Sequence, residues 1–225
     1  MKLRIDVVIA LGVLALVGLT SPLWLRQLKF FQVRSVELVG VKHLDRGGVL
    51  DALELEPNHS LFSDLDVIER RVAAMPGVVD VQVARRLPAT LRISVTEAEP
   101  IAFVSGPEGL VALDSEARPL PYDPTGGELD LPIVERASRP LVRMLARIRT
   151  ARREFYNAVG GVRFGVGETT ILEFAESRAV FSGSPSTDEL LRVAAVRRHL
   201  MREGSRLNEL DARFSGWVVA RRVSG

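Results

Sequence analysis

The sequence predicts an α+β protein with a single N-terminal transmembrane helix, a small β-α-α-β-β module and a second, mainly antiparallel β domain that carries helices. Three observations predict this class. A long apolar segment lies near the start of the chain of 225 residues. The patterns that follow do not alternate strand with helix, as a parallel α/β fold requires. Most of the strand-like segments are short and are separated by glycine or proline.

The apolar segment covers residues 7–25 and would form a helix about 29 Å long, close to the ~30 Å of a bilayer core. Trp24 suits the membrane interface. A cleaved signal peptide is the alternative, since Lys2 and Arg4 would form its charged start. The apolar residues that continue after Pro22 favour an uncleaved anchor.

Basic residues flank the apolar segment on both sides, so charge alone does not decide its orientation. A long following domain is translocated largely regardless of its flanking charge. We therefore expect residues 1–6 to form a short cytoplasmic tail and the bulk of the chain to be extracytoplasmic.

The charge composition argues against a nucleic-acid binder. The chain has 30 basic and 28 acidic residues, and all but three of the basic residues are arginines spread along the sequence. A nucleic-acid surface gathers its basic residues on one face. The absence of cysteine excludes a disulfide framework, a thiol nucleophile and a zinc–thiolate site.

The first extracytoplasmic module is expected over residues 30–104, as a small sheet with two helices on its apolar face. Its elements are a strand at 35–38, helices at 45–53 and 63–75, and alternating strands at 79–83 and 91–95. Asp45 is a suitable N-cap, and Ser63 with Asp66 is typical of a capping box. Such a module has no catalytic equipment, but its free sheet edge can accept a strand from a partner.

The module has a specific resemblance. Residues 75–104 read MPGVVDVQVARRLPATLRISVTEAEPIAFV, and residues 33–44 read VRSVELVGVKHL. Together with the preceding apolar helix, they resemble the POTRA domain of the FtsQ/DivIB family of bitopic bacterial cell-division proteins. Ala98 departs from the pattern, because the family often has an arginine after the glutamate at Glu97.

The second module, residues 105–225, resembles the β domain of the same family. Its expected strands are 110–114, 131–134, 162–166, 170–174 and 179–181, its helices are 138–157 and 186–202, and two last strands join at 215–216. Ser186 with Glu189 forms a capping box. Arg139, Arg143 and Arg147 share one helical face, which is either a site for anionic lipid, glycan or nucleic acid or a solvated surface.

No pattern indicates catalysis, a cofactor or a metal. His43, His59 and His199 stand apart from other ligand-type residues. The glycines at 160–167 suggest a phosphate loop only weakly, since no Lys-Ser/Thr pair follows, and a strand hairpin explains them better. We expect no enzymatic activity, no cofactor and no small-molecule substrate.

The resemblance also implies partners. In this family the C-terminal edge of the β domain receives the extracytoplasmic end of the paired FtsB/DivIC- and FtsL-type proteins. Asp211, Arg213 and Phe214 match the family's last strands. The implied partner-binding residues here are Phe214, Ser215, Gly216, Trp217, Val218 and Val219. Trp217 would be an anchor of the interface, and packing into the β domain's own core is the alternative.

The resemblance implies a non-enzymatic scaffold of the divisome, which links early division components to the septal cell-wall synthesis complex. It would contact other divisome membrane proteins and concentrate in the inner membrane at the division septum. The alternative is a single-POTRA periplasmic interaction module of a secretion or outer-membrane assembly system. That class usually brings tandem POTRA repeats and a barrel, which the sequence does not show.

Overall fold

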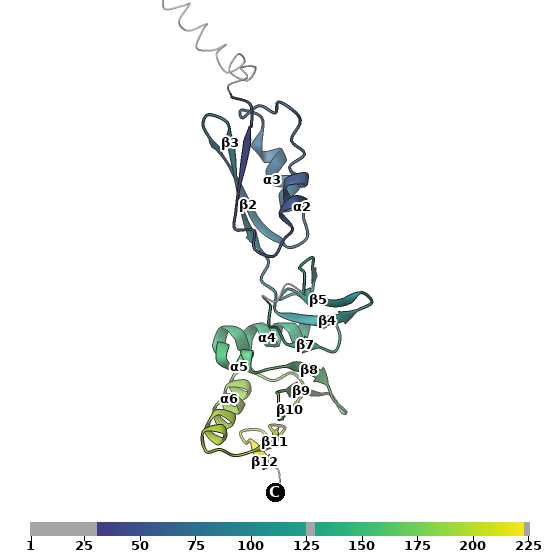
Figure 1. The fold of residues 1–225 in the computed structure, drawn as a ribbon. Helices are drawn as coiled ribbons and strands as arrows, with labels where there is room; N and C mark the ends of the chain where they lie inside the picture. Colours follow the sequence, from purple (N-terminus) through teal and green to yellow (C-terminus); the bar gives the residue numbers. More distant parts are fainter. Residues whose placement is uncertain (1–30, 125–128, 223–225) are drawn as a thin grey trace, which may run out of the picture. The chain divides into compact units, whose positions relative to one another are not determined.

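A computed structural model of the chain describes residues 31–124 and 129–222 (Figure 1). It divides into two compact units, one ending at Glu97 and the other beginning at Ala98. The transmembrane helix predicted at 7–25 lies outside the described residues. Within the described ranges, no helix combines the length and the apolar character needed to cross a membrane.

The first unit is a three-stranded sheet with two helices on one face (Figure 1). Its elements are β1 (Ser35–Val39), α2 (Arg46–Ala52), α3 (Leu65–Ala73), β2 (Val78–Arg86) and β3 (Thr90–Glu97). The strand order is β1-β3-β2, with β1 parallel and β2 antiparallel to the central β3. The predicted order β-α-α-β-β is confirmed.

Alternation along the strands selects the buried face of this sheet. Leu91 and Ile93 of β3 are completely buried, as is Val72 of α3. Burial of each such side chain contributes roughly 2 kcal/mol. Val79 was expected to point inward but is 66% exposed. Val78 pairs with Glu97 and Asp80 with Thr96, so Val79 between them is an extra residue without a partner on β3. Such a bulge breaks the alternation of the strand and turns the extra side chain away from the buried face.

The helix starts depend on carboxylates. Asp45 caps α2 as predicted, and its side chain accepts hydrogen bonds from the backbone N–H groups of Gly47 and Gly48. The capping box expected at Ser63 is wrong. Asp64 is the N-cap of α3 and accepts from the backbone N–H of Asp66 at 3.0 Å. A carboxylate at this position also opposes the positive end of the helix dipole.

Glu97, at the end of β3, holds the loop between β1 and α2. Its carboxylate accepts hydrogen bonds from the backbone N–H groups of Lys42, His43 and Leu44 at 2.8 to 3.1 Å. The His43 ring nitrogen Nδ1 lies 3.1 Å from the same carboxylate. Burial raises the pKa of Glu97, but these donors outweigh burial and the pKa lies below its ordinary value. The carboxylate therefore fixes the end of the unit to its first loop.

The second unit contains a nine-stranded sheet, ordered β12-β11-β10-β9-β8-β7-β4-β5-β6. The strands are β4 (Ala102–Gly106), β5 (Gly109–Leu113), β6 (Pro119–Leu120), β7 (Ile133–Val134), β8 (Gly161–Phe164), β9 (Thr169–Glu173), β10 (Arg178–Ser182), β11 (Leu207–Asp211) and β12 (Val219–Arg222). Antiparallel pairing predominates, as predicted, with parallel pairs at β10–β11, β7–β8 and β4–β7.

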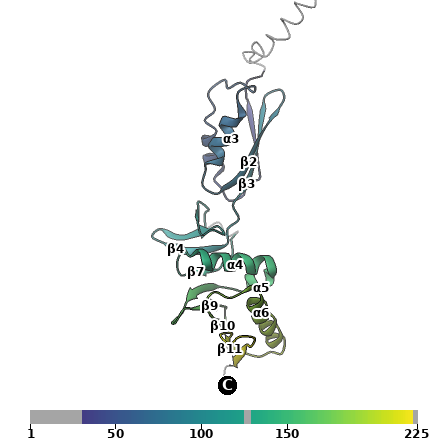
Figure 2. The same ribbon diagram turned by 180° about the vertical axis from the view of Figure 1, so that it is seen from behind.

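Three helices cover one side of this sheet: α4 (Arg139–Ala151), α5 (Arg153–Asn157) and α6 (Thr187–Arg202). Figure 2 shows the same arrangement from behind; α4 packs against α5 and α6, and α6 packs against β11. Leu141, Leu145 and Ile148 of α4 are buried in the core, as their spacing predicts. The capping box of α6 is also confirmed, since Ser186 and Glu189 exchange side-chain-to-backbone hydrogen bonds.

The second unit differs from the prediction in three places. The expected boundary after residue 104 falls inside β4, which pairs with β5 and β7. The expected helix at 138–157 is two helices, because Arg152 takes an extended backbone conformation between α4 and α5. The strands β4 and β6 are not among those predicted from the sequence. Short, fully apolar or proline-containing strands lack the alternation that identifies a strand in sequence.

Candidate functional site

The candidate site is the end of the large sheet formed by β12. This strand runs antiparallel to β11, with Val219 opposite Asp211 and Ala220 opposite Leu210. β12 is the last strand in the sheet order. Among the residues the structure describes, its second side has no paired strand, so its outer backbone groups are free to pair with another chain.

A tight turn precedes β12. The Trp217 backbone N–H donates to the Phe214 carbonyl at 3.1 Å, and Gly216 has a φ of +82°. A positive φ at the third position is what a type II turn requires, and glycine supplies it without strain. The turn at residues 215–216 was predicted. The strand itself begins only at Val219, so residues 214–218 form the approach to the edge and not the edge strand.

Three of the predicted partner-binding residues present apolar side chains to the surface. Phe214 is 56% exposed, Trp217 76% and Val219 45%. The alternative that Trp217 packs into the core of its own domain is therefore wrong. Val218 points the other way and packs against the core, as does Ala220. Ser215 and Gly216 are exposed in the turn.

The turn is held by an ion pair that the sequence pattern did not assign. Asp211 is buried, and its Oδ1 and Oδ2 accept hydrogen bonds from Nε and Nη2 of Arg213 at 2.9 and 2.6 Å. The backbone N–H of Arg213 donates to the same carboxylate at 3.1 Å. Hydrogen bonds from the Arg213 guanidinium hold the pKa of Asp211 below its ordinary value. This pair fixes the point where the chain leaves β11.

A second carboxylate ties β12 to its neighbours. Glu209 of β11 is buried, and its side chain accepts from Arg178 of β10 at 2.7 and 2.8 Å. Arg221 of β12 lies 3.4 Å from the other oxygen of Glu209. Cross-strand pairs of opposite charge stabilise a sheet by a few tenths of a kcal/mol to about 1 kcal/mol each. The edge is thus built on a ladder that spans three strands.

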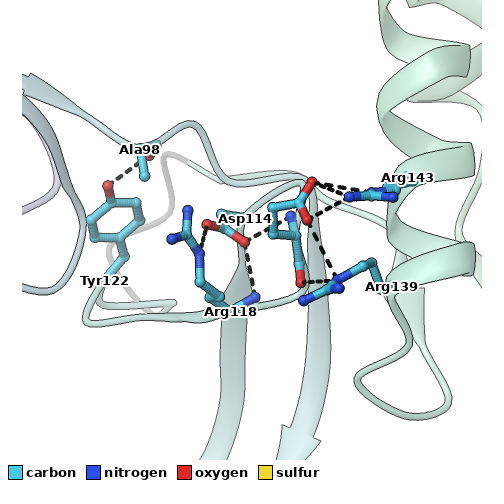
Figure 3. A network of polar contacts seen from close by, with 7 residues as sticks. Ala98, Asp114, Arg118, Tyr122, Arg139 and Arg143 are labelled. Atoms are coloured by element: carbon cyan, nitrogen blue, oxygen red, sulfur yellow. Dashed lines mark hydrogen bonds and ion pairs between the residues drawn. The ribbon is translucent and has the colours of Figure 1, made fainter.

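The arginines of α4 are engaged within the protein. Figure 3 shows Arg139 and Arg143 directed toward the segment that follows β5, where Asp114 holds Arg118. Both α4 arginines pair with Glu116, Arg143 at 2.6 Å. The Arg143 hydrogen bond lowers the pKa of Glu116. These contacts favour a structural role for this arginine face over an anion-binding one.

Other residues singled out in the sequence lie apart from the edge. His43 contacts Glu97 in the first unit, and His199 lies 3.2 Å from Glu203 on α6. In the described part of the chain, no three His, Asp or Glu side chains cluster closely enough to hold a metal ion. Ala98 is buried, and its carbonyl accepts a hydrogen bond from the Tyr122 hydroxyl at 2.6 Å (Figure 3).

Comparison with protein families identifies the first unit. Residues 31–98 match the model of the POTRA domain, FtsQ-type. A solved structure, the major extracytoplasmic domain of the bacterial cell division protein DivIB from Geobacillus stearothermophilus, matches 48% of this chain and 97% of its own. It has a TM-score of 0.35 and 15% sequence identity.

The sequence relatives cover both units. Cell division protein FtsQ of Myxococcus fulvus is 26% identical over 93% of this chain, and FtsQ of Zymomonas mobilis is 26% identical over 86%. The matches span 80% and 63% of those proteins' own lengths. FtsQ of Mycolicibacterium smegmatis is 34% identical over 34% of this chain. The chain is therefore similar to FtsQ cell division proteins across both units, and residues 31–98 match the FtsQ-type POTRA domain.

Proposed function

We propose that this protein is a single-pass membrane scaffold of the divisome, which recruits its partners by strand pairing at β12. The partners would be FtsB/DivIC- and FtsL-type proteins, and the assembly would link early division components to septal cell-wall synthesis. The observation that carries the proposal is that one side of β12 has no paired strand among the described residues, while Val219 of β12 and the preceding Phe214 and Trp217 expose apolar side chains. Backbone pairing supplies affinity in such complexes, and the neighbouring side chains supply specificity.

The alternation of side chains along the β12 segment supports one defined face for docking. Val219 and Arg221 lie on the sheet face opposite the helices, while Val218 and Ala220 face the core. An added strand would meet the free backbone of β12, and its own side chains would reach Trp217 and Val219. Large aromatic side chains at an interface centre are the commonest hot spots.

The binding test uses the full chain in neutral detergent and the extracytoplasmic region of the FtsB/DivIC–FtsL pair from the same organism. Trp217→Ala is expected to weaken binding about 30-fold, the effect of a 2 kcal/mol hot spot. Val219→Asp is expected to weaken it at least as much. The control is Val166→Asp, because Val166 is 97% exposed in the hairpin between β8 and β9. Equal affinities for all four proteins would contradict docking at β12.

The cellular test is fluorescence microscopy of the full chain with an N-terminal fluorescent tag. An intact fusion concentrated at the division site is expected if the N-terminus is cytoplasmic and the anchor is retained. A tag released by cleavage would contradict the anchor. An intact fusion spread evenly around the cell would contradict the role at the septum.

A further inference from the structure

A second feature of the β domain is a pocket between α5 and α6 with a volume of about 310 Å³. It is lined by Arg152, Glu154, Phe155, Ala194, Arg197, Arg198, Met201 and Arg202. One face of α6 supplies four of these residues at the helical spacing i, i+3, i+4, i+7: Ala194, Arg197, Arg198 and Met201. Arg152 stands at the break that separates α4 from α5, so this break places its side chain at the pocket.

The pocket carries a large excess of positive charge. Four of its lining side chains are arginines and one is a glutamate. Among the described residues, the guanidinium groups of these four arginines form no ion pair, in contrast with Arg139 and Arg143 of α4. Clustered like charges without counter-ions repel one another and attract an anion.

Arg197 adds an unsatisfied donor. Its Nε is buried and has no hydrogen-bond partner within the described chain. Its guanidinium stacks on the Phe174 ring at 4.4 Å, and Phe174 packs on Phe155. Burial also lowers the pKa of Arg197. A half-buried cation with one unpaired buried donor is costly, and an anionic group bound in the pocket would offset its charge.

The pocket wall is apolar as well as basic. Phe155 and Ala194 lie among the arginines, and Met201 is 52% exposed beside them. This mixture fits a ligand that combines carboxylates with an apolar side chain. Arginine guanidinium groups bind carboxylates with paired hydrogen bonds, and methionine adapts to varied apolar partners.

We propose that the α5–α6 pocket binds an acidic segment of a partner protein, with its carboxylates on the arginines and an apolar side chain against Phe155 and Met201. A concave pocket of this size accommodates one or two side chains. A membrane surface is better matched by exposed, convex basic residues. This site goes beyond the strand pairing at β12 and does not depend on it.

The test measures fluorescence anisotropy of a labelled peptide, Glu-Glu-Leu-Glu-Glu-Leu, with the full chain in neutral detergent. Its twin, in which every glutamate is glutamine, is expected to bind at least about tenfold more weakly. The double variant Arg198→Gln/Arg202→Gln is expected to weaken binding of the acidic peptide by a similar factor. Both arginines are exposed, so the substitutions leave the fold intact.

The control is the double variant Arg139→Gln/Arg143→Gln. It removes two arginines, as the pocket variant does, but these two lie on α4 and pair with Glu116. Its affinity for the acidic peptide is expected to stay within about twofold of the unchanged protein. Trp217→Ala is also expected to bind the peptide normally. Loss of peptide binding in Trp217→Ala would place the peptide at β12 and overturn the pocket assignment.

Two further outcomes would overturn the proposal. One is equal weakening by the pocket variant and the control variant, which would show general charge attraction. The other is displacement of the peptide by glycerol phosphate at equal concentration, which would indicate a site for lipid headgroups. Arg197→Lys refines the result, because it keeps the charge but loses the planar donor fork, and we expect about tenfold weaker binding.

Discussion

The two ends of the nine-stranded sheet are built differently. β6 has two residues, Pro119 and Leu120, and proline has no backbone N–H to offer another strand. β12 has four residues and contains no proline; it begins with the exposed Val219 and follows the exposed Phe214 and Trp217. Proteins commonly shorten or interrupt an edge strand to prevent association. The contrast supports the proposed docking at β12 and argues against strand addition at β6.

The largest expected effect is a difference in unfolding free energy between substitutions at two adjacent residues near β12, Val218 and Val219. Val218→Asp would bring a carboxylate against the core and is expected to cost about 2 to 4 kcal/mol of unfolding free energy. Val219→Asp places the same charge on the outer face and is expected to cost less than about 0.5 kcal/mol. Thermal unfolding of both variants, followed by circular dichroism, measures the difference. Equal losses would mean that the two side chains do not face opposite ways.

A smaller effect concerns the carboxylate that holds the turn before β12. The pKa of Asp211 is lowered in the folded state by Arg213, so its stabilisation is present above the ordinary carboxyl pKa of about 3.9. It is lost as the pH falls through the lower, folded-state pKa. Asp211→Asn is expected to cost about 1 to 2 kcal/mol at neutral pH and to remove this acid dependence.

Amide hydrogen exchange measures which part of the second unit Asp211→Asn destabilises. In Asp211→Asn, residues 207–222 are expected to exchange faster at neutral pH, while residues 109–120 keep their protection. Uniform acceleration across both regions would indicate that Asp211 supports the whole unit and not the β12 end.

The smallest effect is expected at the β6 end of the sheet. Pro119→Val restores a backbone N–H to β6 and should change the unfolding free energy by less than about 1 kcal/mol. Affinity for the FtsB/DivIC–FtsL pair is expected to stay within twofold, measured as for the β12 variants. A marked change in affinity would show that β6 takes part in partner binding.

Local patterns predicted the elements that depend on neighbours in sequence. The alternation of Leu91, Ile93 and Val95 identified both β3 and its buried face. Asp45 and the Ser186–Glu189 pair identified two helix starts, because capping involves residues only a few positions apart.

Features that depend on contacts between residues far apart in the chain could not be predicted from the sequence. The inverted orientation of Val79 follows from a register shift against β3, which only the paired strands define. Glu97 binds backbone groups 53 to 55 positions away. The end of the large sheet was located from family resemblance, but the opposite orientations of Val218 and Val219 required the register with β11.

The parallel pairing of β1 with β3 has a mechanical consequence. The described chain enters the first unit just before β1 and leaves it after β3, and the two strands pair in parallel from Ser35–Thr90 to Val39–Ser94. A pull on the two ends would therefore slide β1 along β3 and load all their hydrogen bonds together, where an antiparallel pair would open one bond at a time. The Glu97 carboxylate, which accepts hydrogen bonds from the loop after β1, would share that load. A force between the two ends of this unit would therefore meet the whole β1–β3 ladder at once.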